Sequence, residues 1–231
     1  MHHSQLRPDT LERARVNRAG ESRAYREIVP SKTAHLVVDL QNGFVRPGAP
    51  IEVPVAREII GTVNRISDGV RAAGGTNLFF RFTVDPADDW SVYADAFGGA
   101  RLEDDEGNPF LAGRPDHALY DEVDVRPDDL IVDKRRFSGF TPGTSDALRL
   151  LRERDIDTVI ITGTLTNCCC ESTARDAHQL GFRVIFVEDA NAALSDDDHN
   201  ATLNSLAPLF ADVVKSEEVL HLLEAAVSTV A

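Results

Sequence analysis

Residues Ile160–Ala177 read IITGTLTNCCCESTARDA, and the fold of the chain is best worked out from this stretch. Its first residues continue a β-branched strand that begins at Thr158, and the chain then turns through Gly163. From about Cys168 the residues have helical character. A strand that enters a helix through a tight polar turn directs backbone N–H groups and the positive end of the helix dipole at one point. We therefore expect a functional position at this turn.

Three consecutive cysteines occupy the turn, at positions 168–170. A cysteine in the first turn of a helix should have its thiolate favoured, which is the condition for a nucleophile. The alternative is that all three are small buried apolar residues, as free cysteines often are. Adjacent cysteines rarely form a disulfide without strain, and the chain has no other cysteine. We therefore expect a reducing, cytoplasmic location.

The composition is that of a globular protein with a marked negative charge. The 231 residues are 42% hydrophobic and 27% charged, with a net charge of −14 and a pI near 4.8. The length suits one large domain, and the charge disfavours nucleic acid and anionic membrane surfaces. We find neither the apolar core of a signal peptide nor an apolar run of membrane-spanning length. We expect a small-molecule substrate, and no nucleic-acid or membrane partner.

Six short apolar segments alternate with helical segments, which predicts an α/β fold with a parallel sheet covered on both faces. The predicted strands are Ala34–Leu40, Thr76–Phe82, Asp129–Asp133, Thr158–Ile161, Arg183–Val187 and Asp212–Val214. The predicted helices are Val55–Ala73, Ser145–Arg154, a helix from Cys168, Asp196–Phe210 and Ser216–Val227.

The N-terminal segment lies outside this alternation. Residues 1–30 form a polar arm in front of the domain of residues 31–231, with a short helix expected around Thr10–Arg18. The arm would pack on a neighbouring subunit or remain a loosely held terminus. We assign no metal-binding role to His2 and His3.

A long irregular segment follows the second strand. Residues 83–125 show no regular pattern apart from a short helix near Trp90–Phe97. Irregular segments of this length inside a compact domain are usually functional or lie at an interface. We interpret this one as a rim or lid over the site.

Chemically reactive residues follow three of the predicted strands. Asp39 ends the first, Lys134 follows the third, and the cysteine turn follows the fourth. Because parallel strands end at one edge of the sheet, these side chains should converge. Asp39 would take the thiol proton, and Lys134 would lower the thiol pKa and hold the carboxylate. Taken singly, Asp39 could cap a helix and Lys134 could be a solvated charge; their convergence favours an acyl-transfer site.

The sequence around these positions resembles a known superfamily. VVDLQNGF around Asp39, KRRFSGF after the third strand and GTLTNCCCESTARDA are similar to the three signatures of the isochorismatase-like cysteine hydrolases. These include nicotinamidases, N-carbamoylsarcosine amidases and ureidoacrylate amidohydrolases. The resemblance extends from about Thr33 to the last helix and implies a triad of Asp39, Lys134 and Cys169. It assigns Cys169 as the nucleophile because the pattern T-[ND]-x-C-x-x-[ST]-T begins at Thr166.

The resemblance also implies a structure. It is a Rossmann-like, three-layer αβα sandwich whose six-stranded parallel sheet has the order 3-2-1-4-5-6. A non-proline cis peptide bond between Thr164 and Leu165 would turn the N–H of Leu165 toward that of Cys169 and form an oxyanion hole. Cys168 and Cys170 occupy positions of small apolar residues and should point away from Cys169 if the segment is helical. We also expect a homo-oligomer, either a dimer or a tetramer.

Two departures from members of the superfamily narrow the expected chemistry. Nicotinamidases carry zinc-binding histidines after the second strand, where this chain has Thr83–Trp90 (TVDPADDW); we therefore expect no metal and no cofactor. Isochorismatases proper cleave a vinyl ether and lack the nucleophilic cysteine. Cys169 therefore favours hydrolysis of a C–N bond in a small amide or carbamoyl (ureido) compound through a thioester, with release of ammonia. The alternatives are vinyl-ether hydrolase or nicotinamidase activity and, in another class, a non-catalytic binding protein or a redox sensor.

Candidate substrate-binding residues lie beside the expected triad, at strand ends and on the expected lid. They are Gln41, Asn42, Phe44, Arg81, Trp90, Tyr93, Arg135, Arg136, Phe137 and Thr166. The polar groups of Gln41, Asn42 and Thr166 would hydrogen-bond an amide or ureido group. If Arg81 or one of the neighbouring pair of arginines faces inward, the substrate would carry a carboxylate, bound as a guanidinium pair.

Overall fold

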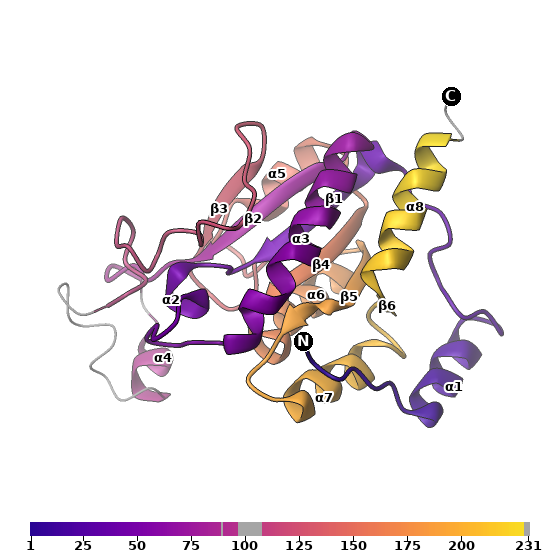
Figure 1. Ribbon diagram of the computed structural model, residues 1–231, viewed down its shortest axis with the longest axis horizontal. Coiled ribbons are helices and arrows are strands. Elements are labelled where there is room, and N and C mark those ends of the chain that lie inside the picture. The colour runs from indigo at the N-terminus through magenta and orange to yellow at the C-terminus, as the bar shows by residue number, and fades with distance from the viewer. Residues whose placement is uncertain (89, 97–107, 229–231) are drawn as a thin grey trace.

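The six predicted strands form one sheet (Figure 1). The computed structural model describes residues 1–88, 90–96 and 108–228. The strands are β1 (Thr33–Val38), β2 (Thr76–Phe82), β3 (Leu130–Lys134), β4 (Thr158–Thr164), β5 (Arg183–Ala192) and β6 (Asp212–Val214). Every neighbouring pair is parallel, and the order is β3-β2-β1-β4-β5-β6. The α/β fold class and the order 3-2-1-4-5-6 are therefore confirmed.

Helices lie on both faces of this sheet and complete the three layers (Figure 1). The helices are α1 (Pro8–Asn17), the 3₁₀ turn η1 (Pro30–Lys32), α2 (Asn42–Val45), α3 (Pro54–Ala72), α4 (Ser91–Ala96), α5 (Ala147–Glu153), the π-helical turn η2 (Thr166–Cys170), α6 (Glu171–Gln179), α7 (Asp196–Leu206) and α8 (Ser216–Ser228). α3 and α8 pack on one face, and α5, α6 and α7 pack on the other. Within the described ranges, no helix is long and apolar enough to cross a membrane.

The centre of the sheet is covered on both faces, because every residue of its two inner strands, β1 and β4, is buried. α3 contributes buried side chains at helical spacing, among them Ile59, Val63 and Ile66. Pro54 begins this helix with a φ already suited to it, and Gly74, with a φ of 83°, ends it in the left-handed region. The predicted helix Val55–Ala73 is thus found almost in full.

β4 runs past its predicted end at Ile161 and continues to Thr164. The turn expected at Gly163 is instead a distortion inside the strand, where the register against β5 shifts. Gly163 has a φ of 121° and lies so close to the backbone of Val38 in β1 that any side chain would collide with it. A glycine is therefore required where β4 leads the chain into the cysteine turn.

Other element boundaries differ from the sequence pattern where tertiary contacts decide them. The helix expected from Cys168 begins as the turn η2 and becomes α-helical only at Glu171. β5 continues beyond Val187 to Ala192 because its end pairs with the distorted end of β4. α7 stops earlier than predicted, at Leu206.

The N-terminal arm is not a loosely held terminus. α1 falls close to the helix expected around Thr10–Arg18, and residues 2–7 are hydrogen-bonded to side chains of α7. Arg18 forms an ion pair of 2.9 Å with the buried carboxylate of Asp212 in β6. The arm is therefore held by its own chain along two elements of the domain.

The irregular segment after β2 is described in part. α4 matches the short helix expected near Trp90–Phe97. Residues 89 and 97–107, which include the end of that expected helix and the middle of the expected lid, lie outside the described residues. Beyond them the chain returns to the domain, and an isolated bridge joins Gln41 to Leu119.

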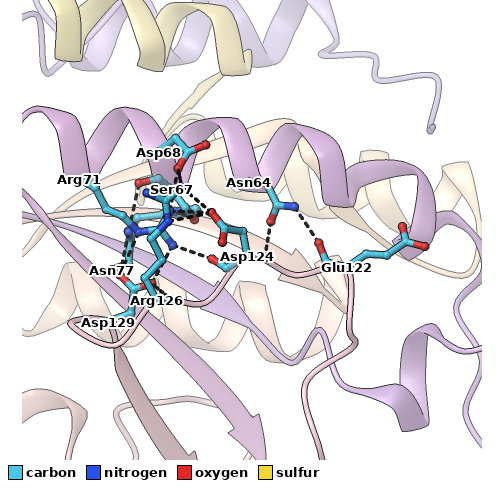
Figure 2. Close-up of polar contacts among 10 residues, drawn as sticks. Asn64, Ser67, Asp68, Arg71, Asn77, Glu122, Asp124, Arg126 and Asp129 are labelled. Carbon is cyan, nitrogen blue, oxygen red and sulfur yellow. Dashed lines mark hydrogen bonds and ion pairs between the residues drawn. The ribbon is translucent and has the colours of Figure 1, made fainter.

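An ion-pair cluster secures the amino-terminal edge of the sheet (Figure 2). Arg71 of α3 lies 2.7 Å from Asp129, 3.1 Å from Asp124 and 2.9 Å from Asp68. Arg126 pairs with the same Asp68 and Asp124 at 2.7 and 3.0 Å. The cluster fastens the segment that leads into β3 onto α3, at the edge of the sheet opposite the cysteine turn.

A histidine of β1 is buried in the core, where its side chain contacts β4 and α3. His35 is fully buried, and its ring nitrogens pair with Ser67 Oγ at 3.1 Å and Thr162 Oγ1 at 2.8 Å. Burial lowers the pKa of His35 to about 3. The imidazole is therefore neutral in the folded protein at physiological pH.

We predict that His35 makes the protein less stable in mild acid. Above pH ~6.5 the imidazole is neutral in both states, but below it the unfolded chain binds a proton that the folded protein excludes down to about pH 3. This costs about 2 kcal/mol of unfolding free energy at pH 5. Urea unfolding at about pH 7, 6 and 5 should show a smaller acid loss for His35→Gln than for the wild type, whereas His221→Gln, at an exposed position, should follow the wild type. Equal losses in all three proteins would contradict this.

Candidate active site

Three strand ends bring the predicted triad together. Asp39 directly follows β1, Lys134 is the last residue of β3, and Cys169 lies in η2, after β4. Lys134 Nζ lies 2.7 Å from Asp39 Oδ2, and both side chains are fully buried. Cys169 is 6% exposed, and its thiol interacts with both charged groups. A carboxylate, an ammonium and a thiol thus meet at the carboxyl edge of the sheet.

Asp39 is compensated by the groups around its carboxylate. These are the Lys134 ammonium at 2.7 Å, the Cys169 thiol and the backbone of Phe82. The φ of Asp39, 52°, lies in the left-handed region, which is uncommon for a residue other than glycine. Burial raises the pKa of the Asp39 carboxyl, and the Lys134 ammonium offsets part of that rise. The carboxylate is therefore a stronger base than an exposed aspartate.

Lys134 remains charged although it is buried. Burial alone would lower the pKa of its ammonium, but Asp39 and Cys169 outweigh burial and raise it. Nζ also donates a hydrogen bond to the carbonyl oxygen of Arg136 at 3.2 Å. It lies 5.1 Å from the centre of the Phe82 ring, within reach of a cation–π interaction.

The Cys169 thiol is protonated in this arrangement, which corrects the expectation of a favoured thiolate. Contact with Cys168 and burial raise the pKa of Cys169 well above its ordinary value, and Lys134 opposes the rise. The helix start does not lower the pKa of Cys169, because contact with Cys168, burial and the nearby carboxylate of Asp39 together raise it. Reaction at this sulfur therefore needs a base in contact with it.

The expectation that Cys168 points away from Cys169 is also wrong. Their side chains interact, and the hydrogen bond from Cys169 lowers the pKa of the Cys168 thiol. The physical reason is that η2 is a π-helical turn, in which successive side chains diverge less than in an α-helix. Cys170, by contrast, is fully buried in the apolar core beneath α6.

The turn before Cys169 has the predicted cis peptide bond. The peptide bond between Thr164 and Leu165 is cis. The carbonyl oxygen of Leu165 accepts hydrogen bonds from the N–H groups of Cys168 and Cys170, each at 3.1 Å. These bonds close the start of η2. The role of the Leu165 and Cys169 N–H groups as an oxyanion hole stays a prediction.

The two amide side chains predicted to bind substrate are bonded within the protein. Gln41 is fully buried; Nε2 donates to the carbonyl oxygens of Phe82 (3.0 Å) and His117 (2.8 Å), and Oε1 accepts from the Phe82 N–H (2.7 Å). Both N–H groups of the Gln41 side chain are used in these bonds, and the residue joins the end of β1 to the end of β2. It is therefore not free to donate to a substrate, which corrects its assignment as a substrate donor. Asn42 donates to the carbonyl oxygen of Pro115 at 2.8 Å.

Each of the three candidate arginines is paired with a carboxylate. Arg81 Nε lies 2.7 Å from Asp133 Oδ1. Arg135 and Arg136 both reach Asp88 Oδ2, at 2.8 and 3.0 Å. Their charges are balanced inside the protein, which weakens the expectation that one of them binds a carboxylated substrate.

An aromatic cluster adjoins Lys134. Its members are Phe44, Phe82, Trp90, Tyr93, Phe110 and Phe137. Trp90 and Phe137, both predicted to bind substrate, make an edge contact with 5.1 Å between ring centres and are only partly buried. Phe44, the other predicted aromatic, is buried and stacks on Phe110 at 4.5 Å. Sequence reasoning missed Phe82 and Phe110, which join these rings.

Two buried histidines were also missed, since no motif marks them. His199 Nδ1 lies 3.0 Å from Thr166 Oγ1, so the hydroxyl that was predicted to bind substrate has a partner inside the protein. His117 Nε2 lies 2.8 Å from Thr83 Oγ1 and 3.7 Å from Asp133. Burial lowers the pKa of both imidazoles. In the part of the chain that the structure describes, no group of three or more His, Cys, Asp or Glu side chains is placed to hold a metal ion.

Known proteins share this sequence and fold. The sequence profile of the isochorismatase domain matches residues 33–218. The ureidoacrylate amidohydrolase RutB of Pseudomonas syringae pv. syringae is 32% identical over 180 residues, which cover 70% of this chain and 71% of that protein. The crystal structure of a cysteine hydrolase from Pseudomonas syringae pv. phaseolicola superimposes with a TM-score of 0.80 at 30% identity, covering 88% of this chain and 97% of that one.

A third similar protein has a solved structure as well. The N-carbamoylsarcosine amidase from Thermoplasma acidophilum superimposes with a TM-score of 0.67 at 25% identity, covering 80% of this chain and 97% of that one. The matched range of the domain contains all three strand ends described above. This chain therefore belongs to the isochorismatase family of hydrolases.

Proposed function

We propose that this protein is a cysteine hydrolase that cleaves a C–N bond of a small amide or carbamoyl (ureido) compound through a thioester and releases ammonia. The observation that carries the proposal is the buried ion pair of Asp39 and Lys134 in contact with the thiol of Cys169. The similarity to a ureidoacrylate amidohydrolase and an N-carbamoylsarcosine amidase supports the choice of a C–N bond.

In the acylation step, Asp39 takes the proton of the Cys169 thiol while Sγ attacks the carbonyl carbon of the substrate. The raised pKa of Asp39 suits this role, because it makes proton transfer from a thiol less unfavourable. The carbonyl electron pair moves onto oxygen, where the N–H groups of Leu165 and Cys169 stabilise it. The C–N bond then breaks, and Asp39 returns its proton to the nitrogen, which leaves as ammonia.

In the deacylation step, water replaces the leaving nitrogen. Asp39 accepts a proton from the water as the water oxygen attacks the thioester carbon. The C–S bond then breaks, Asp39 gives this proton to the thiolate of Cys169, and the carboxylic acid product leaves. Lys134 keeps a positive charge beside both Asp39 and the sulfur throughout, which stabilises the thiolate whenever it forms. The ammonium itself transfers no proton.

The surroundings of the triad bear on the substrate. The partly buried rings of Trp90 and Phe137 offer apolar surface, and the candidate arginines are paired with Asp88 and Asp133. This environment favours an uncharged group next to the scissile amide over a carboxylate.

The first prediction concerns the reaction. A panel of small primary amides and ureido compounds, each with and without a carboxylate, should contain compounds from which the enzyme releases ammonia, and uncharged members should react faster. Because the proposed chemistry uses only protein groups, EDTA should leave the rate unchanged. Loss of activity with EDTA and its return with zinc would support a nicotinamidase instead. Peroxide-dependent loss of thiols without turnover of any amide would support a redox sensor.

The second prediction concerns the reacting cysteine. Cys169→Ala should abolish turnover because the nucleophile is lost, while Cys170→Val should retain it. Cys168→Val should retain turnover and lower the pKa of Cys169, because the contact that raises it is removed. Iodoacetamide labelling followed by mass spectrometry checks the assignment. Label found on Cys168 or Cys170 with Cys169 untouched would refute it.

The third prediction concerns Lys134. Lys134→Met should raise the pKa of the Cys169 thiol further and slow acylation by orders of magnitude, because the buried sulfur loses its positive neighbour. The thiol pKa is measured from the pH dependence of iodoacetamide alkylation, with circular dichroism to verify the fold. The control is Lys32→Met, which removes a lysine whose side chain is 42% exposed and paired with Asp155. An unchanged thiol pKa in Lys134→Met would mean that this lysine is only structural.

A further inference from the structure

The residues in front of α1 are fastened to the helix that packs against the cysteine turn. Residues 2–7, called the strap below, contain no helix or strand and run beside α7 (Figure 1). α7 in turn packs on η2, which carries Cys169. One helix therefore separates the strap from the proposed nucleophile.

Two asparagines of α7 form hydrogen bonds with the backbone of the strap. Asn200 donates from Nδ2 to the carbonyl oxygen of His3 (3.0 Å) and accepts at Oδ1 from the N–H of Gln5 (2.6 Å). Asn204 repeats the pattern with the carbonyl oxygen of Gln5 (2.9 Å) and the N–H of Arg7 (2.8 Å). Four helical residues advance about 6 Å and two extended residues about 6.6 Å, so the two repeats match. The strap is thus held through its main chain at two successive steps.

The first side chain of the strap, that of His2, is held at both of its ring nitrogens. His2 Nδ1 lies 2.7 Å from Asp196 Oδ1, and Nε2 accepts a hydrogen bond from the N–H of Ala193 at 2.9 Å. A carboxylate only accepts and a backbone N–H only donates, so both ring nitrogens of His2 have a partner on α7 or just before it. The side chain is 3% exposed, and its ring stacks on that of His199 with 4.5 Å between centres.

His199 connects the strap to the cysteine turn. It is fully buried; Nε2 lies 3.2 Å from Ser4 Oγ in the strap, and Nδ1 lies 3.0 Å from Thr166 Oγ1, in the first residue of η2. Burial lowers the pKa of His199 to about 4, so the ring is neutral at physiological pH. A neutral imidazole can pair with a hydroxyl on each side because each hydroxyl either donates or accepts.

We propose that His199 is a positioning residue for the nucleophile turn and that the strap holds it in place. The hydrogen bond to Thr166 fixes the start of η2, three residues before Cys169 along a turn of only five residues. The stacked ring of His2 and the hydroxyl of Ser4 hold the imidazole from the side away from the turn. This inference rests on the proposed function, since it concerns the same nucleophile.

The contact between His199 and Thr166 is tested by substitution at both ends. His199→Phe, which keeps a ring to stack on His2 but loses the hydrogen bond, should lower kcat about tenfold, the scale of one buried hydrogen bond, and leave KM little changed. His199→Asn keeps a polar group near the position of Nδ1 and should restore most of the rate. Thr166→Val should also lower kcat, and combining it with His199→Phe should cost no more than either change alone. Additive losses would show that the two residues act independently, which would overturn the proposal.

The strap is tested without touching the site. Asn200→Ala combined with Asn204→Ala should lower kcat and speed iodoacetamide alkylation of Cys169, because the turn is held less firmly. The matched control is Asn17→Ala, which breaks a bond from α1 to the carbonyl oxygen of Pro208 but leaves the strap in place; it should behave as the wild type. His2→Ala provides a milder variant should the double substitution not fold. A fall in the urea midpoint with unchanged kcat and alkylation would show that the strap only stabilises the fold.

These readouts separate this inference from the proposed function. If the wild type hydrolyses no amide, the proposed function fails, while alkylation of Cys169 still reports on the turn. Equal alkylation rates in the wild type, the strap variants and His199→Phe would overturn the inference whatever the substrate. Faster alkylation in these variants, with the rate of Asn17→Ala unchanged, would support it.

Discussion

The buried ion pair of Asp39 and Lys134 is the interaction on which the rest of the site depends. Removing two charges from water costs several kcal/mol for each ion, and only close pairing compensates for it. At 2.7 Å and with no exposure of either side chain, each charge makes the burial of the other tolerable. Contact with Cys168 and burial raise the pKa of the Cys169 thiol most, and the pair acts on it in two opposing ways, because the ammonium favours the thiolate while the carboxylate disfavours it. A neutral thiol beside a strengthened base is the consequence.

The sheet order explains how the pair can exist. Asp39 follows β1 and Lys134 ends β3, two strands that are separated by β2 alone. Gln41 ties the end of β1 to the end of β2 through the backbone of Phe82. The ion-pair cluster around Arg71 fastens the other edge of the sheet, where the chain enters β3. The strand that carries Lys134 is thus fastened where it begins, and where it ends the N–H of Thr83 donates a hydrogen bond to the carbonyl oxygen of Lys134 at 2.9 Å. These contacts keep a long, flexible side chain in one place.

Much of this arrangement could be predicted from the sequence, because it depends on patterns within short segments. Continuous apolar segments mark the buried strands, and parallel strands necessarily end at one edge, so the meeting of Asp39, Lys134 and the cysteine turn was predictable. The predictions that were wrong or missing concern features that depend on contacts between distant segments of the chain. The turn η2 is π-helical and packs against α7, which is distant in the sequence, and its side chains Cys168 and Cys169 interact. The partner of Thr166 comes from a helix thirty-three residues further along the chain, without any motif to announce it.

The ion pairs around the site also bear on the charge that a substrate can carry. The chain as a whole carries a net charge of −14, yet Asp39 is compensated by Lys134, and the guanidinium groups of Arg135 and Arg136 share the carboxylate of Asp88. An ionised substrate group would have to compete with these existing pairs and lose its own hydration, which is costly in a buried site. An uncharged amide avoids both costs, because its carbonyl needs only two N–H donors. The paired charges around the site are therefore the physical basis for proposing a neutral substrate.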